Sequence, residues 1–147
     1  MFFLKELPSQ QMVEGYSKRF SVKDPAAVQG ALTMMRDASL LLRELEGYFS
    51  EHGTSQLRFL VMIVIDREPQ RDSLLASEIA ERIDVSRPVM TRTLKSMVED
   101  ELIVMEADSS DGRAKCVALT ENGKKFLQKI LPGYFKTISK FMEELNK

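Results

Sequence analysis

The sequence is poor in the residues that build disulfides and common metal sites. It contains one cysteine, Cys116, one histidine, His52, and no tryptophan. A single cysteine excludes a disulfide within the chain, and one cysteine with one histidine leaves no ordinary zinc-ligand spacing. We therefore predict no metal, no cofactor and a reducing, cytoplasmic location.

Long apolar runs are also missing. Residues 1–4, MFFL, are too short for the core of a signal peptide, and no run approaches the roughly 20 apolar residues of a membrane helix. The sequence therefore predicts neither secretion nor contact with a membrane.

The usual patterns of catalytic chemistry are lacking as well. There is no glycine-rich phosphate loop, no recognisable Ser/His/Asp or Cys/His pair, and no paired carboxylates beyond the run at 99–101, EDE. We predict that the protein is not an enzyme.

The overall charge offers no broad basic surface. Lys and Arg number 21 against 22 Asp and Glu, which gives a net charge of −1 and a pI near 5.9. Any contact with nucleic acid must therefore come from a local basic patch.

The chain is organised around residues 76–120. Leu75, Ile79 and Ile83 recur every four residues and predict a helix with one apolar stripe. Asp84 tolerates left-handed backbone, so a turn is expected at residues 84–85 with a new helix directly after it.

This second helix is predicted to begin at Ser86, with the hydroxyl accepting from first-turn amides and Pro88 tolerated beside it. Between residues 86 and 98 there are three basic side chains and no acid. A helical projection places Met90, Leu94 and Met97 on one side, and Pro88, Thr91, Arg92, Lys95 and Ser96 on the other, with Arg87 at its edge. The outward face is predicted to be cationic, which is the first indication of DNA binding.

A hairpin should follow this helix. Residues 102–105 and 114–119 favour two strands, and the sequence DSSDG between them is typical of a turn. Thr120 is expected to begin another helix, with Glu121 in its first turn. The predicted fold class is α+β, mainly α: a winged helix–turn–helix with N- and C-terminal dimerisation helices.

The same stretch resembles the MarR family of winged-helix transcriptional regulators. The resemblance is carried by ASEIAERIDVS, RPVMTRTLKSMV, LIV and above all DGRAKCVALTENG, which is similar to the family's wing signature of Asp-x-Arg followed by a Leu-Thr-x-x-Gly helix start. The chain departs from the family at residues 99–101, where basic residues and a glycine are common, and at Met105, where arginine is common. These departures weaken the expectation of phosphate contacts there.

The resemblance implies a ligand-responsive repressor that binds double-stranded DNA at an inverted-repeat operator as a homodimer. Arg113 has two compatible interpretations: it could hold the hairpin turn by pairing with Asp111, or it could enter an AT-rich minor groove. The predicted DNA-binding residues are Ser86, Arg87, Pro88, Thr91, Arg92, Lys95, Asp111, Arg113 and Lys115.

The flanking segments carry apolar stripes that one small lobe cannot cover. Helices are expected after Pro8, over 25–50, over 56–68 and over 121–147, with a kink or a break at Pro132-Gly133. For 56–68 a strand is the alternative, and Thr54 or Ser55 could cap the helix. We predict one domain, with a DNA-binding lobe at about 54–120 and a dimerisation region at about 1–50 and 121–147.

Three further hypotheses stay open at the level of sequence. The resemblance implies a small aromatic effector, for which Tyr48, Phe49 and Phe59 could form a wall, although each ring could simply be core. Cys116 could sense oxidants, or be an inert, half-buried thiol. The alternative function is a winged-helix protein-interaction module without DNA binding, which the acids at 99–101 and the near-neutral charge favour.

Overall fold

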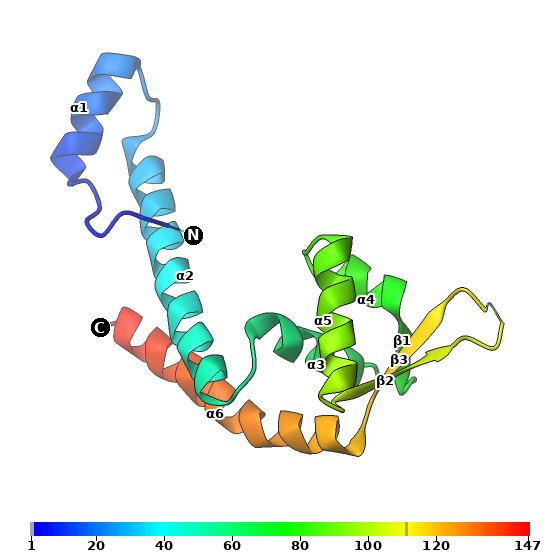
Figure 1. Ribbon diagram of the computed structural model, residues 1–147. Coiled ribbons are helices and arrows are strands. Elements are labelled where there is room, and N and C mark those ends of the chain that lie inside the picture. Colours follow the sequence, from blue (N-terminus) through cyan, green and yellow to red (C-terminus); the bar gives the residue numbers. More distant parts are fainter. Residues whose placement is uncertain (1, 111) are drawn as a thin grey trace. The chain divides into compact units, whose positions relative to one another are not determined.

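The computed structural model describes residues 2–110 and 112–147. The chain consists of two compact units, Met1–Gly47 with Thr137–Lys147, and Tyr48–Lys136. The elements in chain order are α1 (Gln10–Phe20), α2 (Pro25–Glu51), α3 (Gln56–Asp66), β1 (Ser73–Leu75), α4 (Ala76–Arg82), α5 (Arg87–Glu99), β2 (Ile103–Ala107), β3 (Lys115–Leu119) and α6 (Glu121–Leu145). Figure 1 follows them along the chain.

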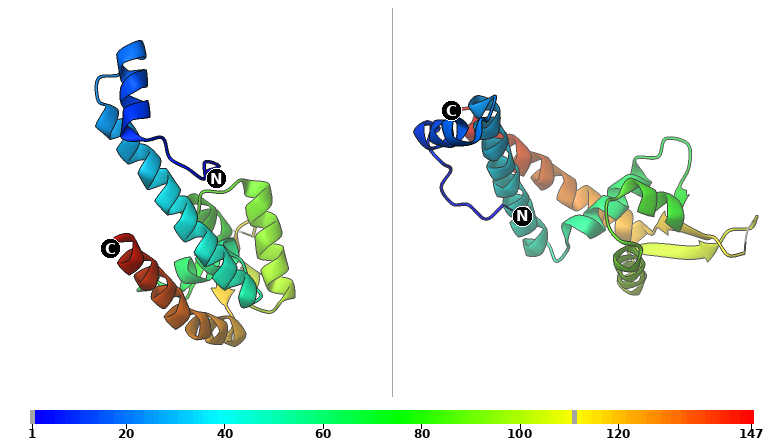
Figure 2. Two further views of the ribbon diagram at one scale, coloured as in Figure 1. Left: turned by 90° about the vertical axis from the view of Figure 1, so that its left-hand side faces the viewer. Right: turned by 90° about the horizontal axis from the view of Figure 1, so that it is seen from above.

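The unit Tyr48–Lys136 is a winged helix. Its three strands form an antiparallel sheet in the order β1-β3-β2, with Val117 of β3 opposite Leu74 on one side and Met105 on the other. Helices α3, α4 and α5 pack on this sheet, and the β2–β3 hairpin extends past them as the wing (Figure 1; Figure 2, right). The predicted α+β, mainly α winged helix–turn–helix is confirmed.

Helix α3 forms the centre of the core of this unit. Ser55 caps it, since its hydroxyl accepts from the amide of Arg58 at 3.3 Å, which decides between the two expected caps. Its apolar side chains point in nearly all directions and are covered by the sheet and the neighbouring helices. The buried members are Phe59, Val61, Met62, Val64 and Ile65. The strand alternative for this segment was wrong.

The sheet differs from the predicted two-stranded hairpin. Residues 73–75 form a third strand, β1, directly before α4. Three residues are too few for alternation to indicate a strand, because only pairing with β3 defines it. The wing strands are confirmed with shifted ends, because β2 runs to Ala107 and β3 begins at Lys115 rather than at residue 114.

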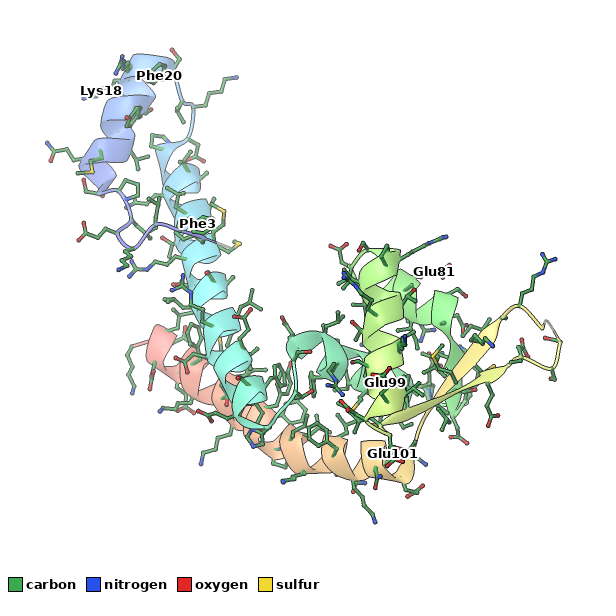
Figure 3. The ribbon with its side chains drawn as sticks, viewed as in Figure 1. Phe3, Lys18, Phe20, Glu81, Glu99 and Glu101 are labelled. Atoms are coloured by element: carbon green, nitrogen blue, oxygen red, sulfur yellow. The ribbon has the colours of Figure 1, made fainter. Side chains whose placement is uncertain are left out.

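The other unit contains α1, most of α2 and the C-terminal part of α6. Ser9 and Asp24 cap α1 and α2 by accepting amide hydrogen bonds at 3.2 and 3.1 Å. Met12, Tyr16 and Phe20 form one stripe of α1 and are each about 60% exposed; Phe20 is labelled in Figure 3. The stripe is confirmed as helical, and its apolar side chains are left uncovered by this chain.

Helix α6 continues through Pro132 without a break. Of the two expected outcomes, the break was wrong: proline removes one amide donor, but the rest of the hydrogen-bond ladder holds the helix together. Within residues 2–110 and 112–147, no helix is both long enough and apolar enough to cross a membrane.

Candidate DNA-binding interface

The first helix of the helix–turn–helix is fixed at its start by Glu78. The carboxylate accepts from the amide of Leu75 at 2.8 Å and from Arg71 at 3.1 Å. The pKa of Glu78 lies below its ordinary value, mainly because the carboxylate accepts the hydrogen bond from the Leu75 amide. Arg71 lowers the pKa further. At the other end, the amide of Val85 donates to the carbonyl of Ile83 at 2.9 Å and closes the turn that was predicted at residues 84–85.

Helix α5 begins at Ser86, as predicted, but the cap differs from the expectation. The carbonyl of Ser86 accepts from the amide of Met90 at 3.0 Å, whereas its hydroxyl makes no capping bond. An N-cap hydroxyl normally satisfies the amide of the second or third residue of the helix. The second residue here is Pro88, which has no N–H, and the hydroxyl does not use the amide of the third residue, Val89. The side chain of Ser86 is exposed on the outer surface.

The two faces of α5 follow the predicted pattern except at Ser96, which is half-buried and donates to the carbonyl of Thr93 at 3.2 Å. Met90, Leu94 and Met97 are buried to 3% exposure or less against the unit core. The outward face, defined here as the cationic face, is exposed throughout and consists of Arg87, Pro88, Thr91, Arg92 and Lys95. The Thr91 hydroxyl donates to the carbonyl of Arg87 at 2.9 Å, so toward a ligand it can only accept.

The cations of this face differ from other arginines of the same unit. Within the described residues 2–110 and 112–147, the side chains of Arg87, Arg92 and Lys95 form no ion pair. Elsewhere in the unit, arginines are paired with acids in Arg58–Asp100, Arg71–Glu78 and Arg82–Glu68. The positive charge of α5 is thus left available to an external anion.

The wing contributes two more exposed cations, Arg113 beside the hairpin turn and Lys115 at the start of β3. Asp111 lies outside the described residues, so its pairing with Arg113 stays a prediction. Both basic residues sit on the hairpin that projects from the lobe (Figure 2, right).

The C-terminal end of α5 is acidic, with Glu99, Asp100 and Glu101 in succession. Figure 3 shows Glu99 and Glu101 at the end of the helix opposite to its start. Glu101 adopts a left-handed conformation with φ 56°, and the amides of Glu101 and Leu102 donate to Val98 and Met97, both at 3.0 Å. This is a Schellman C-cap with glutamate where glycine is usual.

The Leu-Thr-x-x-Gly start of α6 packs against this C-cap. Thr120 caps α6 through its hydroxyl, which accepts from the amide of Gly123 at 2.9 Å and donates to the carbonyl of Glu101. A Cβ on Gly123 would overlap the carbonyl oxygen of Leu102, with the carbonyl carbon at 3.1 Å. The glycine thus permits the close approach of α6 to the segment that links α5 to the wing.

Comparison with known proteins agrees with this geometry. The family model described as MarR family matches residues 52–114, from the end of α2 through the wing turn. Over these residues the chain is similar to the MarR family. The HTH-type transcriptional repressor YetL of Bacillus subtilis (strain 168) is 27% identical over 141 residues, which cover 95% of this chain and 83% of YetL.

Solved MarR structures share the fold. AbsC, a MarR family transcriptional regulator from Streptomyces coelicolor, has a TM-score of 0.72 at 17% identity, over 96% of this chain and 84% of AbsC. The M. tuberculosis transcriptional regulator MosR in complex with DNA has a TM-score of 0.59 at 29% identity, over 74% of this chain and 76% of MosR.

The three residues predicted to wall an effector site lie in an aromatic cluster of the unit Tyr48–Lys136. Phe49 and Phe59 are about 1% exposed, with ring centroids 4.9 Å apart, and Tyr134 lies 4.6 Å from Phe59. The Tyr48 hydroxyl donates to the carbonyl of Ile130 at 2.6 Å. Burial raises the pKa of Tyr48, and a hydrogen bond from the backbone of Tyr134 offsets part of the rise. An effector role for these rings stays a prediction.

The Tyr48 contact was missed from sequence. Its phenol engages both the carbonyl of Ile130 and the backbone of Tyr134, which lie four residues apart in α6. A Cβ on Gly133 would lie 2.7 Å from Cε2 of this ring, so only glycine leaves room for it. The Pro-Gly pair was a usable signal for an irregular helix, but nothing local pointed to a tyrosine 85 positions earlier.

Proposed function

We propose that this chain is a cytoplasmic transcriptional regulator of the MarR family that binds double-stranded DNA as a homodimer and represses from an inverted-repeat operator. It is proposed to act without catalysis. The relatives support the regulatory class, since YetL is a transcriptional repressor and MosR was solved in complex with DNA. We also retain the predicted organisation, with a DNA-binding lobe at about 54–120 and dimerisation segments on both sides.

The unpaired cations of the cationic face carry this proposal. In a helix–turn–helix, the second helix enters the major groove and its N-terminal residues face base edges. Arg87, Thr91, Arg92 and Lys95 are exposed on that helix, and Ser86 and Pro88 set its start. The wing residues Arg113 and Lys115, with Asp111, are assigned to the adjacent backbone or minor groove.

The first test is a salt titration of binding to a random-sequence duplex and to a duplex selected from random DNA. A DNA-binding regulator should lose affinity steeply as salt rises, because bound phosphates release counterions. Arg92→Ala should weaken binding to one or both duplexes. Arg67→Ala is the matched control, because Arg67 is exposed and follows α3, outside α5 and the wing. Unchanged affinity of Arg92→Ala for both duplexes would remove Arg92 from the interface.

Dimerisation is supported by apolar side chains that this chain leaves exposed on its terminal helices. Isolated exposed apolar residues are common, but a long series of them at helical spacing favours a second protein surface. They are Met12, Tyr16, Phe20, Val28, Met34, Met35, Leu42, Phe135, Met142 and Leu145. Two-fold pairing would present two α5 helices to half-sites about 10 base pairs apart. A monomeric mass by light scattering at micromolar concentration would contradict it.

A protein-interaction module is the second candidate function. The observation that favours it is the acidic C-terminal end of α5, where Glu99 and Glu101 form no ion pair in the part of the chain that is described. Such a module would show weak binding to both duplexes with little dependence on salt, so the same titration separates the two functions.

Regulation by a small aromatic effector is proposed for the cluster of Tyr48, Phe49 and Phe59. A releasing ligand must bind the free dimer more tightly than the DNA-bound dimer, and by linkage DNA must weaken the ligand by the same factor. A panel of small aromatics that neither shifts the melting temperature nor weakens operator binding would argue for another kind of effector.

A further inference from the structure

A groove of about 500 Å³ lies between α4 and the N-terminal half of α5. Small and apolar side chains form much of its lining, and its two charged residues are Glu81 and Arg87. The groove therefore opens beside the cationic face, with one acid directly at its edge. Figure 3 places Glu81 near the start of α5, at the opposite end from Glu99 and Glu101.

In the described part of the chain, no ion pair explains the position of Glu81. It is exposed, and among residues 2–110 and 112–147 its carboxylate takes part in no ion pair. The other acid of α4, Glu78, is held by Leu75 and Arg71 and has a structural role. An acid left free beside cations that would bind phosphate reduces affinity for any DNA backbone.

Next to particular bases, the Glu81 carboxylate can leave the DNA-binding affinity unchanged or increase it. In the major groove, cytosine N4 and adenine N6 present amino donors, and a carboxylate accepts from such a donor. On a sequence that places an amino group next to Glu81, this contact offsets the repulsion from phosphate. On other sequences only the repulsion is left.

We propose that Glu81 is a specificity-determining residue of the DNA interface, which lowers affinity for random DNA more than affinity for the preferred operator. This inference rests on the proposed DNA-binding function. It assigns discrimination to the first helix of the helix–turn–helix, in addition to the exposed residues of α5.

The test compares Glu81→Gln and Glu81→Ala with the unaltered full-length protein. Dissociation constants are measured at one salt concentration for a duplex selected by the unaltered protein and for a random-sequence duplex of equal length. Glu46→Gln is the control, because Glu46 is an exposed acid of α2 and its loss changes the net charge equally. Melting temperatures confirm that the variants fold.

Both Glu81 variants should bind random DNA about threefold or more tightly, because one screened charge near phosphate is removed. Their affinity for the selected duplex should not rise with it, so the ratio of the two affinities should fall by at least that factor. Glu46→Gln should keep the ratio of the unaltered protein.

Equal tightening on both duplexes, or no change on either, would overturn the role of Glu81. Failure of the underlying function has a different signature, in which the unaltered protein itself shows no salt-dependent binding and selects no sequence. The two failures are therefore distinguishable in one set of measurements.

Discussion

Glu101 is predicted to be a point at which glycine would improve the fold. Its φ of 56° lies in the left-handed region, which costs a residue with a Cβ about 1–2 kcal/mol. Replacing it with glycine removes that cost, but gives back about 0.4–1 kcal/mol because the unfolded chain becomes more flexible. The backbone hydrogen bonds of the C-cap stay intact, since they use main-chain atoms only. We expect Glu101→Gly to stabilise the protein by about 0.5–1 kcal/mol.

A second contribution comes from charge. Glu101 is an acid at the negative end of the α5 dipole, an unfavourable placement of about 0.3–1 kcal/mol at low salt. Glu101→Gln removes this term while keeping a Cβ in the left-handed conformation. The difference between the glycine and glutamine variants therefore measures the backbone term. Glu99→Gly, inside the last turn of α5, should destabilise the protein because the helix gains flexibility without relief of strain.

The assay is thermal unfolding at one fixed protein concentration, because melting of a dimer depends on concentration. For a chain of this length, 1 kcal/mol corresponds to a shift of about 2–4 °C. Glu101→Gly should thus melt up to a few degrees higher than the unaltered protein. A lower melting temperature, or an equal gain in Glu101→Gln, would refute the argument from backbone conformation.

Three other changes test the packing and the electrostatics. Gly123→Ala should destabilise the protein by about 1–3 kcal/mol in urea unfolding, because its Cβ would overlap the Leu102 carbonyl oxygen. An unchanged unfolding midpoint would mean that α6 and the Leu102 backbone lie farther apart than in this structure. Tyr48→Phe should cost about 1–2 kcal/mol in the same assay, because the carbonyl of Ile130 loses its hydroxyl donor, and a neutral result would show that helix α6 restores its own bond. Glu78→Gln should flatten the fall in melting temperature on acidification. The lowered native pKa of Glu78 means that its stabilising contribution is present above the ordinary value of 4.5 and is lost as pH falls through the native value. An unaltered acid limb in that variant would contradict this role.

The parts of this fold that were predictable from sequence are those defined by neighbours in the chain. Apolar spacing located α2, α4, α5 and α6, and it separated Met90 and Leu94 from the exposed face that carries Arg92. The caps at Ser55, Asp24 and Thr120 follow from a side chain acting on amides two or three residues away. Such interactions are complete within one turn, so the sequence contains all the groups concerned.

Two errors show where local reasoning ends. The Ser86 hydroxyl was expected to make a capping bond that the structure does not contain, because Pro88 offers no amide and the hydroxyl does not use the amide of Val89. β1 is different in kind, because Ser73–Leu75 becomes a strand through pairing with β3, about 40 residues later. No pattern within three residues contains that information.

The Pro132-Gly133 part of α6 depends on a local sequence pattern and on a contact with a residue far away in the sequence. Pro132 and Gly133 predicted a kink or a break; the helix is continuous, and proline accounts for one missing amide donor. What occupies the site is the phenol of Tyr48, 82 residues before the Ile130 carbonyl that it contacts. The glycine is required by the partner rather than by the helix, since a Cβ there would meet the ring while the helical backbone itself would accept alanine. A breaker pair inside an apolar helix can thus indicate a side chain from elsewhere as well as a kink, and only the tertiary structure identifies that side chain.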